Sequence, residues 1–293
     1  MNPCIVLDLD HSLGRLPGAR VVPLEHWQET LRFCCTLRAM ARFSRLLDDV
    51  LPADGHATVM LGSGDFHHLT WPLVRRMRAS APFQVVVLDN HPDNMRFPFG
   101  VHCGSWVRRV AMLPTVAHVH VVGITSADIG PRHAWENQWT PLRRGKLSYW
   151  SIGTDTRWAV RAGLGHAFNS FHDADALTRA FIARQRQAPC AAYLSIDKDV
   201  FAPGVAHTNW DQGVLGLDHA RALIDSLHGG GLVGSDITGE ISAYRYRHWW
   251  KRVLSALDAQ PDVDTPELPR WQAGQHALNL DLLEAIAALP AAG

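Results

Sequence analysis

Short apolar stretches and helix-like patterns alternate along the chain. Several stretches are brief and mostly apolar, as expected of buried strands: residues 5–9, 57–61, 85–88, 116–124, 191–196 and 232–235. Others repeat apolar residues at helical spacing: residues 24–50, about 68–78, 174–186, 217–228 and 278–289. Strands that alternate with helices predict one doubly wound, parallel α/β sheet. Because no internal repeat or break in composition divides the chain, we expect a single domain over residues 1–293.

Two segments fall outside this pattern. Residues 125–156 are irregular and rich in Trp, Gly and Pro, and we expect a long excursion near the mouth of a site, because such loops are often functional. Residues 244–252 (YRYRHWWKR) are basic and aromatic, a composition that can stack on nucleic-acid bases. In a chain with no net charge, a helix with one buried aromatic face is the better prediction for them.

Charge and cysteine usage narrow the setting. The chain has 28 basic and 28 acidic residues, so we expect neither a nucleic-acid partner nor a membrane surface. The apolar runs are short and the start MNPCIVLDLD lacks the pattern of a signal peptide. Five cysteines, of which Cys34 and Cys35 are adjacent, argue against a disulfide framework and predict a reducing, cytoplasmic location.

The stretch 85–93, VVVLDNHPD, carries the first candidate chemistry. Four apolar residues predict a buried strand, and Asp89, His91 and Asp93 then alternate with Asn90 and Pro92. If the strand geometry persists, the three side chains point to one face. Two carboxylates and an imidazole there form half of a site for a hard cation.

Two other predicted strand ends supply further ligands. GSGDFHH, with His67 and His68, follows the strand 57–61, and SIDKD, with Asp197 and Asp199, ends the strand 191–196. Open α/β sheets bind ligands at the carboxyl ends of their strands, so these residues are expected to meet. Four carboxylates in one buried site need cations to balance them. Oxygen-rich ligation with two imidazoles and no thiolate favours two Mn²⁺ ions, which activate a water near neutral pH.

Other polar residues at strands carry weaker signals. Asp8-Leu9-Asp10-His11 resembles the first motif of haloacid-dehalogenase-type phosphatases, but His11 stands where that motif has Thr or Val. We expect these acids to be solvated or to support a site elsewhere. His118 and His120 lie two apart on a predicted strand, where a pair can bind metal, although half-exposed histidines are the more common outcome.

Several motifs together resemble the arginase/agmatinase (ureohydrolase) superfamily, which includes divergent peptide arginases. DNHPD resembles its DxHxD, SIDKD its SxDxD, GSGDFHH its GGDH, VHCG its HG turn, and GSDITGE lies where the family has a DxxE segment. The motifs occur in the family's order between Gly62 and Glu240. The resemblance implies a three-layer αβα fold with a doubly wound, mostly parallel sheet.

The resemblance also implies the ligands of two Mn²⁺ ions: His67, Asp89, His91, Asp93, Asp197 and Asp199. Asp89 and Asp197 would bridge the ions. His67 and Asp93 would complete one shell, and His91 and Asp199 the other.

Catalytic roles follow from the same resemblance. His102 would pass a proton to the leaving amine, and Glu240 would receive the guanidinium group, which pairs bidentately with a carboxylate. Asp199 is counted with the catalytic residues as well as with the ligands. The implied reaction is attack of activated water on a guanidino carbon, which gives an amine and urea.

The chain departs from the family's motifs at three positions. Phe66 separates Asp65 from His67, so either His67 or His68 is the ligand. Lys198 occupies a position that is usually small or apolar, and it either points away from the site or pairs with a carboxylate. The acid spacing that leads to Glu240 is one residue longer than in the family.

The segment between Asp93 and His102 bears on the substrate. It is shorter than in enzymes that act on free arginine and lacks their Asn/Thr/Ser pattern for binding an amino-acid carboxylate. The expected substrate is therefore an agmatine-like amine, another guanidino acid, or arginine within a peptide, which would become ornithine. Four tryptophans either line a wide mouth or pack in the interior: Trp135, Trp139, Trp150 and Trp210.

Two other functions compete with this one. A related metal-dependent hydrolase would cleave the C–N bond of an amide or formimino group, and a non-catalytic binding protein would retain the scaffold alone. The complete set of six ligand positions argues against the second.

Overall fold

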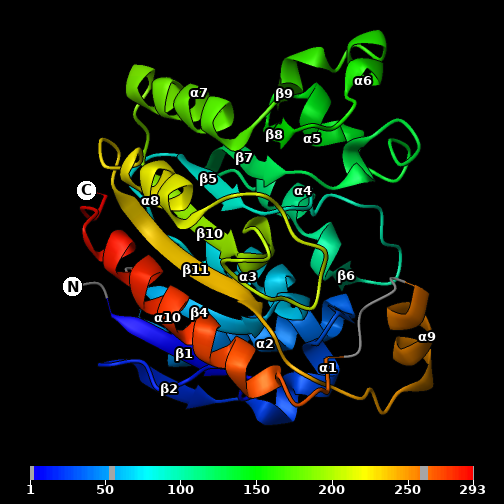
Figure 1. The fold of residues 1–293 in the computed structure, drawn as a ribbon, viewed down its shortest axis with the longest axis vertical. Helices are drawn as coiled ribbons and strands as arrows, with labels where there is room; N and C mark the ends of the chain where they lie inside the picture. Colours follow the sequence, from blue (N-terminus) through cyan, green and yellow to red (C-terminus); the bar gives the residue numbers. More distant parts are fainter. Residues whose placement is uncertain (1–2, 53–56, 258–262, 293) are drawn as a thin grey trace.

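The core of the molecule is a parallel β-sheet. In the computed structural model, which describes residues 3–52, 57–257 and 263–292, nine strands lie in the order β2-β1-β4-β11-β10-β5-β7-β8-β9, all pairs parallel (Figure 1). The strands are β1 (Cys4–Asp8), β2 (Arg20–Pro23), β4 (Thr58–Ser63), β5 (Phe83–Leu88), β7 (Val116–Ile124), β8 (Leu147–Ile152), β9 (Phe168–Phe171), β10 (Ala192–Asp197) and β11 (Leu232–Glu240). A separate antiparallel pair joins β3 (Cys34–Cys35) to β6 (Val101–His102).

Helices cover both faces of the sheet (Figure 1). One face packs against α2 (Leu37–Val50), α3 (Thr70–Arg75), α4 (Val107–Ala111), α5 (Trp139–Arg143) and α6 (Arg157–Arg161), and the other against α7 (Ala174–Gln187), α8 (Leu217–Asp225) and α10 (Leu268–Ala287). In β5, Val85 and Val87 face the first group, and Val86 and Leu88 face the second. Burial on both sides explains the unbroken apolar run of this strand. The predicted three-layer αβα architecture with a doubly wound sheet is confirmed.

Short 3₁₀ turns connect many of these elements: η1 (Glu25–Trp27), η2 (Gly64–Leu69), η3 (Cys103–Ser105), η4 (Ala127–Ile129), η5 (Gly165–Ala167) and η6 (Lys198–Val200). Two of them, η2 and η6, begin directly after β4 and β10. They turn the chain at the sheet edge where the candidate ligands lie.

The apolar pattern missed the outer strands. β2 and β9 are edge strands with half-exposed or exposed side chains, so they lack an apolar run. β8 is largely buried, but its sequence LSYWSI mixes serines with aromatic residues, and the prediction that residues 125–156 are irregular is wrong there. An aromatic strand near the sheet edge does not need the continuous Val and Ile of a central one.

The predicted helix over residues 24–50 is also wrong in its first half. The regular helix α2 starts at Leu37, where Thr36 accepts a hydrogen bond from the backbone N–H of Ala39. Before it, the chain forms η1, the short α1 (Gln28–Leu31) and β3, with Phe33 at a φ of 71°. Tertiary contacts decide this local structure, because β3 pairs with β6 more than sixty residues away.

Lys251 fixes the same segment from the other end of the chain. It is buried, and its Nζ donates to the backbone carbonyls of Glu29, Thr30 and Arg32 at 2.7, 3.2 and 2.8 Å. Lys251 belongs to α9 (Trp249–Leu257), which lies beside α1 (Figure 1). Helix formation thus begins later than predicted for residues 244–252, and Trp249 is exposed rather than buried.

The later helices agree better with their patterns. Asp173 caps α7 by accepting from the backbone N–H of Ala176 at 2.7 Å, as predicted. The final helix α10 starts ten residues before the predicted 278. Among the helices in the described ranges, not one combines the length and apolar character that crossing a membrane requires.

Strand β11 continues five residues beyond the predicted 232–235. Its register against β4 shifts on both sides of Thr238, and Gly239 adopts a φ of 89°. This bulge changes which face the following side chain meets. Asp236 bonds to Thr70 of α3, whereas Glu240 bonds to Asn279 of α10 on the opposite layer.

Gly239 is the position where this arrangement is most sensitive. A Cβ there would lie 2.4 Å from Asp197 Oδ1 and 2.5 Å from the Lys198 N atom. We predict that Gly239→Ala lowers the free energy of unfolding by about 1–3 kcal/mol, the usual cost of such backbone strain. It should also weaken Mn²⁺ binding, because the added Cβ displaces Asp197. Thermal unfolding and metal titration measure both.

Gly274→Ala is the matched control, because Gly274 lies in α10 and a Cβ there meets nothing within 4 Å. This substitution should stabilise the helix by roughly 0.5–1 kcal/mol. Equal effects of the two substitutions would contradict the strain argument.

Candidate metal centre

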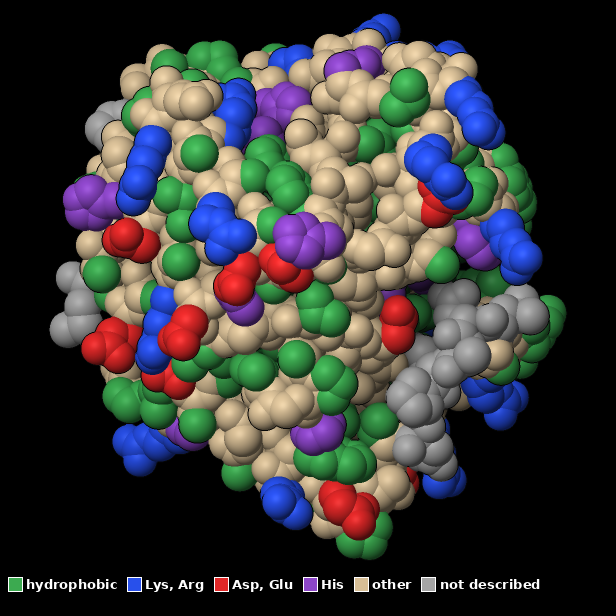
Figure 2. Space-filling model, turned by 45° about the horizontal axis from the view of Figure 1, so that its top comes forward, with side chains coloured by type: hydrophobic (Ala, Val, Ile, Leu, Met, Phe, Trp, Pro, Cys, Tyr) green, Lys and Arg blue, Asp and Glu red, His purple; other side chains and the backbone are tan. Residues whose placement is uncertain are grey.

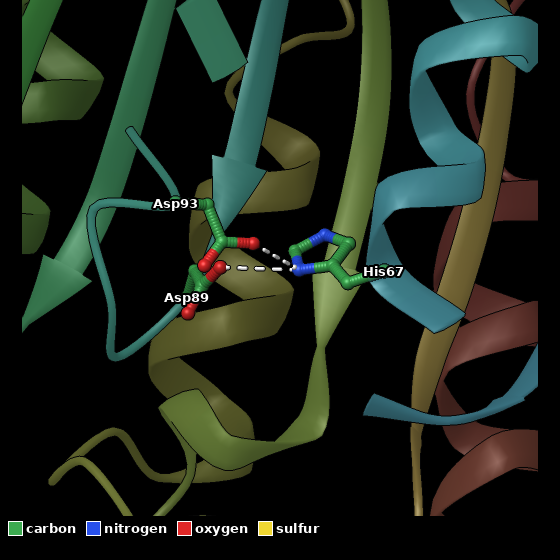
Figure 3. A group of neighbouring side chains, drawn as sticks. All are labelled: His67, Asp89 and Asp93. Atoms are coloured by element: carbon green, nitrogen blue, oxygen red, sulfur yellow. Dashed lines mark ion pairs between the residues drawn. The ribbon is translucent and has the colours of Figure 1, made fainter. Parts of the chain in front are cut away.

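The candidate ligands come from the carboxyl ends of three strands near the middle of the sheet. His67 lies in η2 after β4, Asp89, His91 and Asp93 follow β5, and Asp197 and Asp199 end β10 and enter η6. Figure 3 shows Asp89 and Asp93 directed at the His67 ring. The structure therefore brings the residues of three separate motifs together.

The first group of ligands centres on His67. Its Nδ1 lies 2.9 Å from Asp93 Oδ2 and 3.2 Å from Asp89 Oδ2. Asp197 Oδ2 lies 3.3 Å from the same nitrogen. All four side chains are buried.

The second group contains His91 and Asp199 and again includes Asp89. His91 Nδ1 lies 2.9 Å from Asp199 Oδ2 and 3.7 Å from Asp89 Oδ1. The donor atoms of His67, Asp89 and Asp93 lie within 4.8 Å of one another, and so do those of Asp89, His91 and Asp199. Because Asp89 offers one oxygen to each group, the geometry is that of two adjacent cation sites with a shared carboxylate.

The backbone after β5 turns instead of remaining extended. The strand ends at Leu88, Asp89 Oδ1 accepts from the His91 backbone N–H at 2.6 Å, and Asp93 has a φ of 45°. The expectation that the three ligands share one face of an extended strand is therefore wrong. A tight turn brings them together, and Trp106 Nε1 holds Asp93 by donating to its Oδ2 at 2.6 Å.

A chain of hydrogen bonds orients His67. Its Nε2 lies 3.0 Å from Ser195 Oγ, which donates to Asp236 Oδ1 at 2.7 Å. Asp236 also accepts from Thr70 Oγ1 at 3.0 Å and from Tyr193 OH at 2.7 Å. Since Ser195 gives its own proton to Asp236, it accepts from His67 Nε2–H, which leaves Nδ1 facing the acids.

Burial and repulsion perturb the acids. Burial raises the pKa of Asp197 to about 7. Burial and the charges of Asp197 and Asp89 raise the pKa of Asp199 well above its usual range. Burial alone would raise the pKa of Asp89, but its contacts with His67 and His91 lower it. The shifts mark a centre whose carboxylates need positive charge nearby.

The two imidazoles respond in the opposite direction. Burial would lower the pKa of His67, but Asp89 and Asp93 raise it well above the usual value. Burial would likewise lower the pKa of His91, and Asp199 raises it. These protons balance the carboxylates and compete with a metal ion for the same atoms.

The donor set fits divalent cations. Oxygen atoms dominate both groups, each group adds one imidazole, and neither contains a thiolate. Asp89 Oδ2 is buried and makes no hydrogen bond with acceptable geometry among the described residues, so its lone pair suits a cation. Hard oxygen donors of this kind suit Mn²⁺ and similar ions.

Comparison with known proteins places the chain in a family. A model of the arginase family matches residues 12–243, which contain all the candidate ligands. The chain belongs to the arginase family. An uncharacterized protein of Thermotoga maritima is 27% identical to it over 194 residues. That alignment covers 66% of this chain and 62% of the Thermotoga protein, less than two thirds of its length.

Solved structures of low sequence identity share the fold. The native arginase of Bacillus caldovelox is 14% identical and superimposes with a TM-score of 0.55 over 98% of this chain and 99% of its own. Proclavaminate amidino hydrolase of Streptomyces clavuligerus is 18% identical, with a TM-score of 0.53 over 98% and 92%. Agmatine ureohydrolase of Thermoplasma volcanium is 14% identical, with a TM-score of 0.53 over 97% and 89%.

In this arginase-family protein, His67 rather than His68 faces the acids. His68 is fully buried, and no ion pair links it to a carboxylate among the described residues. Burial lowers the pKa of His68 well below its usual value. A neutral, buried imidazole of this kind contributes to packing.

A cavity of about 510 Å³ opens onto the centre. Its wall contains all the candidate ligands except Asp89, together with further side chains, most of them polar or aromatic: Met95, His102, Cys103, Asp128, His133, Glu136, Trp210 and Asp211. His102 is buried in this wall, and its Nδ1 accepts from the Gly104 backbone N–H at 2.9 Å. Because Nδ1 accepts this bond, the ring carries a proton on Nε2, where it can act as a donor.

Glu240 is not placed as the family resemblance implied. Its carboxylate pairs with the buried Lys198 ammonium and accepts from Asn279 Nδ2 at 2.7 Å, and Lys198 also donates to Asn279 Oδ1 at 3.0 Å. Glu240 is absent from the cavity wall formed by the described residues. The bulge at Gly239 is the physical reason, because it turns Glu240 toward α10. Lys198 thus takes the second of its two predicted alternatives and pairs with a carboxylate.

The other sequence candidates have structural roles. Asp8 bonds to His11, and Asp10 accepts from Arg32 and Ser242, so the phosphatase motif carries no separate metal group in the described chain. His118 Nδ1 donates to the Gly145 carbonyl oxygen at 3.0 Å, and its Nε2 lies 2.9 Å from Ser148 Oγ. His120 Nδ1 accepts from Trp150 Nε1 at 3.2 Å, and burial keeps its pKa well below the usual value.

The four tryptophans divide between the two expectations. Trp210 lines the cavity, and Trp135 is 67% exposed. Trp150 is buried and stacks on Phe171, and the half-buried Trp139 stacks on Trp158.

Sequence reasoning missed the residues that support the ligands. Trp106 and Asp211 contact ligands directly, and Asn90 connects the ligand turn to Thr125 and Asp211. Asn90 lies inside the DNHPD motif, which was a usable signal. Asp211 lies in a loop with no recognisable pattern.

Lys198 and Glu240 form a buried ion pair whose two partners depend on each other. We predict that Lys198→Met lowers the free energy of unfolding by about 3–5 kcal/mol, because Glu240 is left charged and buried. Lys198→Met combined with Glu240→Gln should recover most of this loss, since the amide still accepts from Asn279. Chemical denaturation with a chelator present measures stability without metal. A single variant as stable as the parent would show that the pair is not the constraint.

Protons and metal ions compete for Asp197. In the folded protein its pKa is about 7, far above the ~3.9 of an unfolded aspartate. The stability that this proton gives the metal-free fold is therefore full below about pH 3.9, declines above it, and is lost as the pH rises through 7. We predict that the increase in melting temperature caused by Mn²⁺ is larger at pH 8 than at pH 6. Differential scanning fluorimetry with and without Mn²⁺ measures it, and an increase independent of pH would contradict the prediction.

Proposed function

We propose that this arginase-family protein is a dimanganese-dependent hydrolase that cleaves a guanidino C–N bond and releases urea from a substrate other than free L-arginine. The observation that carries the proposal is the pair of ligand groups that share Asp89 and that border a cavity with His102 in its wall. The family membership and the fold shared with ureohydrolases support the same reaction.

The residues divide the work of the reaction. When bound, two divalent cations lower the pKa of a water molecule and so supply a nucleophile near neutral pH. Asp89 and Asp197 would bind the cations, and the imidazoles of His67 and His91 complete the two ligand groups. His102 lines the same cavity, and its Nε2–H can protonate the nitrogen that leaves.

The cavity wall supports a cationic substrate. Asp128 and Glu136 lie in the wall, and no Lys or Arg lines it among the described residues. A substrate carboxylate would find no Lys or Arg there, whereas a guanidinium or amine would find the carboxylates of Asp128 and Glu136. This favours an agmatine-like amine, or an arginine side chain in a peptide that becomes ornithine, over a guanidino acid.

The surface shown in Figure 2 bears on nucleic-acid binding rather than on the small substrate. On the face shown in Figure 2, Lys and Arg side chains are scattered among acidic, apolar and neutral ones, without a continuous basic patch. Nucleic-acid binding normally relies on such a patch.

One observation favours a second function. Glu240, which the family resemblance assigns to the guanidinium, is held by Lys198 and Asn279. A hydrolase of a neutral amide needs no carboxylate at that position. The same centre could then cleave such a C–N bond.

A urea-release assay distinguishes these functions. The protein loaded with Mn²⁺ is incubated with agmatine, an arginine-containing peptide, 4-guanidinobutyrate and L-arginine. We expect urea from agmatine or the peptide and much less from the other two. If two Mn²⁺ ions are bound but no urea appears from any of them, the formimino or amide reaction becomes the better proposal. Release of formamide and the free amino acid from a formimino amino acid, or of the free amine from an amide, tests it.

Two substitutions assign the residues. Asp197→Ala should lose metal and activity together, because this carboxylate lies beside the first group. His102→Asn should retain both metal ions but slow turnover by roughly 10²–10⁴-fold, the usual contribution of general acid catalysis. Unchanged turnover in His102→Asn would remove it as the proton donor.

A further inference from the structure

His91 is held at both ends of its ring by carboxylates. Its Nδ1 lies 2.9 Å from Asp199 Oδ2, and its Nε2 lies 2.8 Å from Asp211 Oδ1. Asp199 belongs to the second ligand group, whereas Asp211 belongs to neither group. One ring nitrogen therefore faces the metal site and the other faces a residue of the loop between β10 and α8.

We propose that Asp211 is a positioning residue of the metal centre, which keeps the proton of His91 on Nε2 and directs the Nδ1 lone pair at the second cation site. The proposal rests on the dinuclear centre proposed above. Imidazoles that bind metals commonly donate their other N–H to a carboxylate, which fixes the tautomer and the orientation of the ring. His67 achieves this through Ser195 and Asp236, and His91 achieves it through direct contact with Asp211.

Asn90 holds Asp211 in place. The Asn90 amide donates to the Asp211 backbone carbonyl at 3.0 Å and to its Oδ2 at 3.2 Å. Its own oxygen accepts from the Thr125 backbone N–H at 3.1 Å and from Thr125 Oγ1 at 2.5 Å. The Asn90 backbone N–H donates to Asp199 Oδ1 at 3.1 Å. A single fully buried side chain thus sets Asp211 at a fixed position relative to the ligands.

The loop that carries Asp211 is built onto the ligand segment. The Gly213 N–H donates to the Asp199 carbonyl at 2.6 Å, and a Cβ on Gly213 would lie 2.4 Å from the Val200 carbonyl oxygen. Gln212 donates to the carbonyls of Phe201 and Ala206 at 3.1 and 2.9 Å. The loop is therefore ordered by backbone contacts that do not require the Asp211 carboxylate.

The exposure of Asp211 makes it possible to tell an effect on metal binding from an effect on the stability of the fold. Its side chain is 71% exposed, whereas that of His91 is 16% exposed. An exposed aspartate contributes little to the core, so its replacement should leave the fold intact. Its effect should appear in metal binding, through the ring of His91.

The experiment measures Mn²⁺ binding to the full chain. Isothermal titration calorimetry gives the affinity of each equivalent, and electron paramagnetic resonance reports whether two Mn²⁺ ions lie close enough to couple. For Asp211→Ala we expect one equivalent to bind as in the parent and the other to bind about 10–100-fold more weakly, with loss of the coupled signal. Asp211→Asn should fall between the two, because its amide oxygen can still accept from Nε2–H.

Asp175→Ala is the matched control. Asp175 Oδ1 lies 2.9 Å from His219 Nε2 and its side chain is 69% exposed, but this pair lies outside the cavity wall and both ligand groups. Its removal should leave both Mn²⁺ equivalents unchanged. In a His91→Ala background, Asp211→Ala should cause no further loss, because the two residues act through one ring.

The outcomes separate the two proposals, since none of these measurements needs a substrate. Two tightly bound equivalents in Asp211→Ala would overturn the positioning role and leave the proposed function standing. Equal weakening of both equivalents would also overturn it. Binding of only one equivalent by the parent would overturn the dinuclear centre, and the positioning role with it. Urea assays that fail while the metal data behave as expected would overturn the proposed reaction alone.

Discussion

The structure depends on one electrostatic constraint, which is the crowding of four carboxylates in a buried space. Asp89, Asp93, Asp197 and Asp199 lie at the ends of two neighbouring strands, and no Lys or Arg of the described chain pairs with them. Such a cluster is stable only with protons or cations. His67 and His91 lie among these acids, and the hydrogen bonds that orient each ring keep a nitrogen beside the carboxylates. The imidazoles thereby help to balance the negative charge.

Much of this centre was predictable from the sequence, because its information is local. The chain 89–93 places three ligands within five residues after an apolar run, and parallel strands bring their carboxyl ends to one edge of the sheet. The detailed geometry was not predictable. Asp93 reaches the site through a positive φ, and Asp211 enters from a loop more than a hundred residues away. Helix periodicity likewise failed over residues 24–36, where Lys251 and the β3–β6 pairing decide the backbone.

Glu240 lies in the acidic segment that the family motif predicts, but its side chain does not point where the motif implies. Its position in the sequence matches an acidic segment, but the bulge at Gly239 reverses its direction, and Lys198 neutralises it. Period-two reasoning along a strand fails wherever the register slips by one residue. The spacing between Asp236 and Glu240 is one residue longer than in the family, and this extra residue indicated the bulge in the sequence.

The Lys251 contacts carry a consequence for the cavity. The carbonyls that this ammonium gathers end at Arg32, and the next residue, Phe33, places its ring 4.3 Å from that of His102 and accepts from the Cys103 backbone N–H. His102, the group proposed to protonate the leaving nitrogen, therefore packs against Phe33 in the N-terminal part of the chain. Lys251 of α9, near the C-terminus, holds the backbone just before Phe33 in place. Changes in α9, far from any metal ligand in sequence, would be transmitted mechanically to the proton donor.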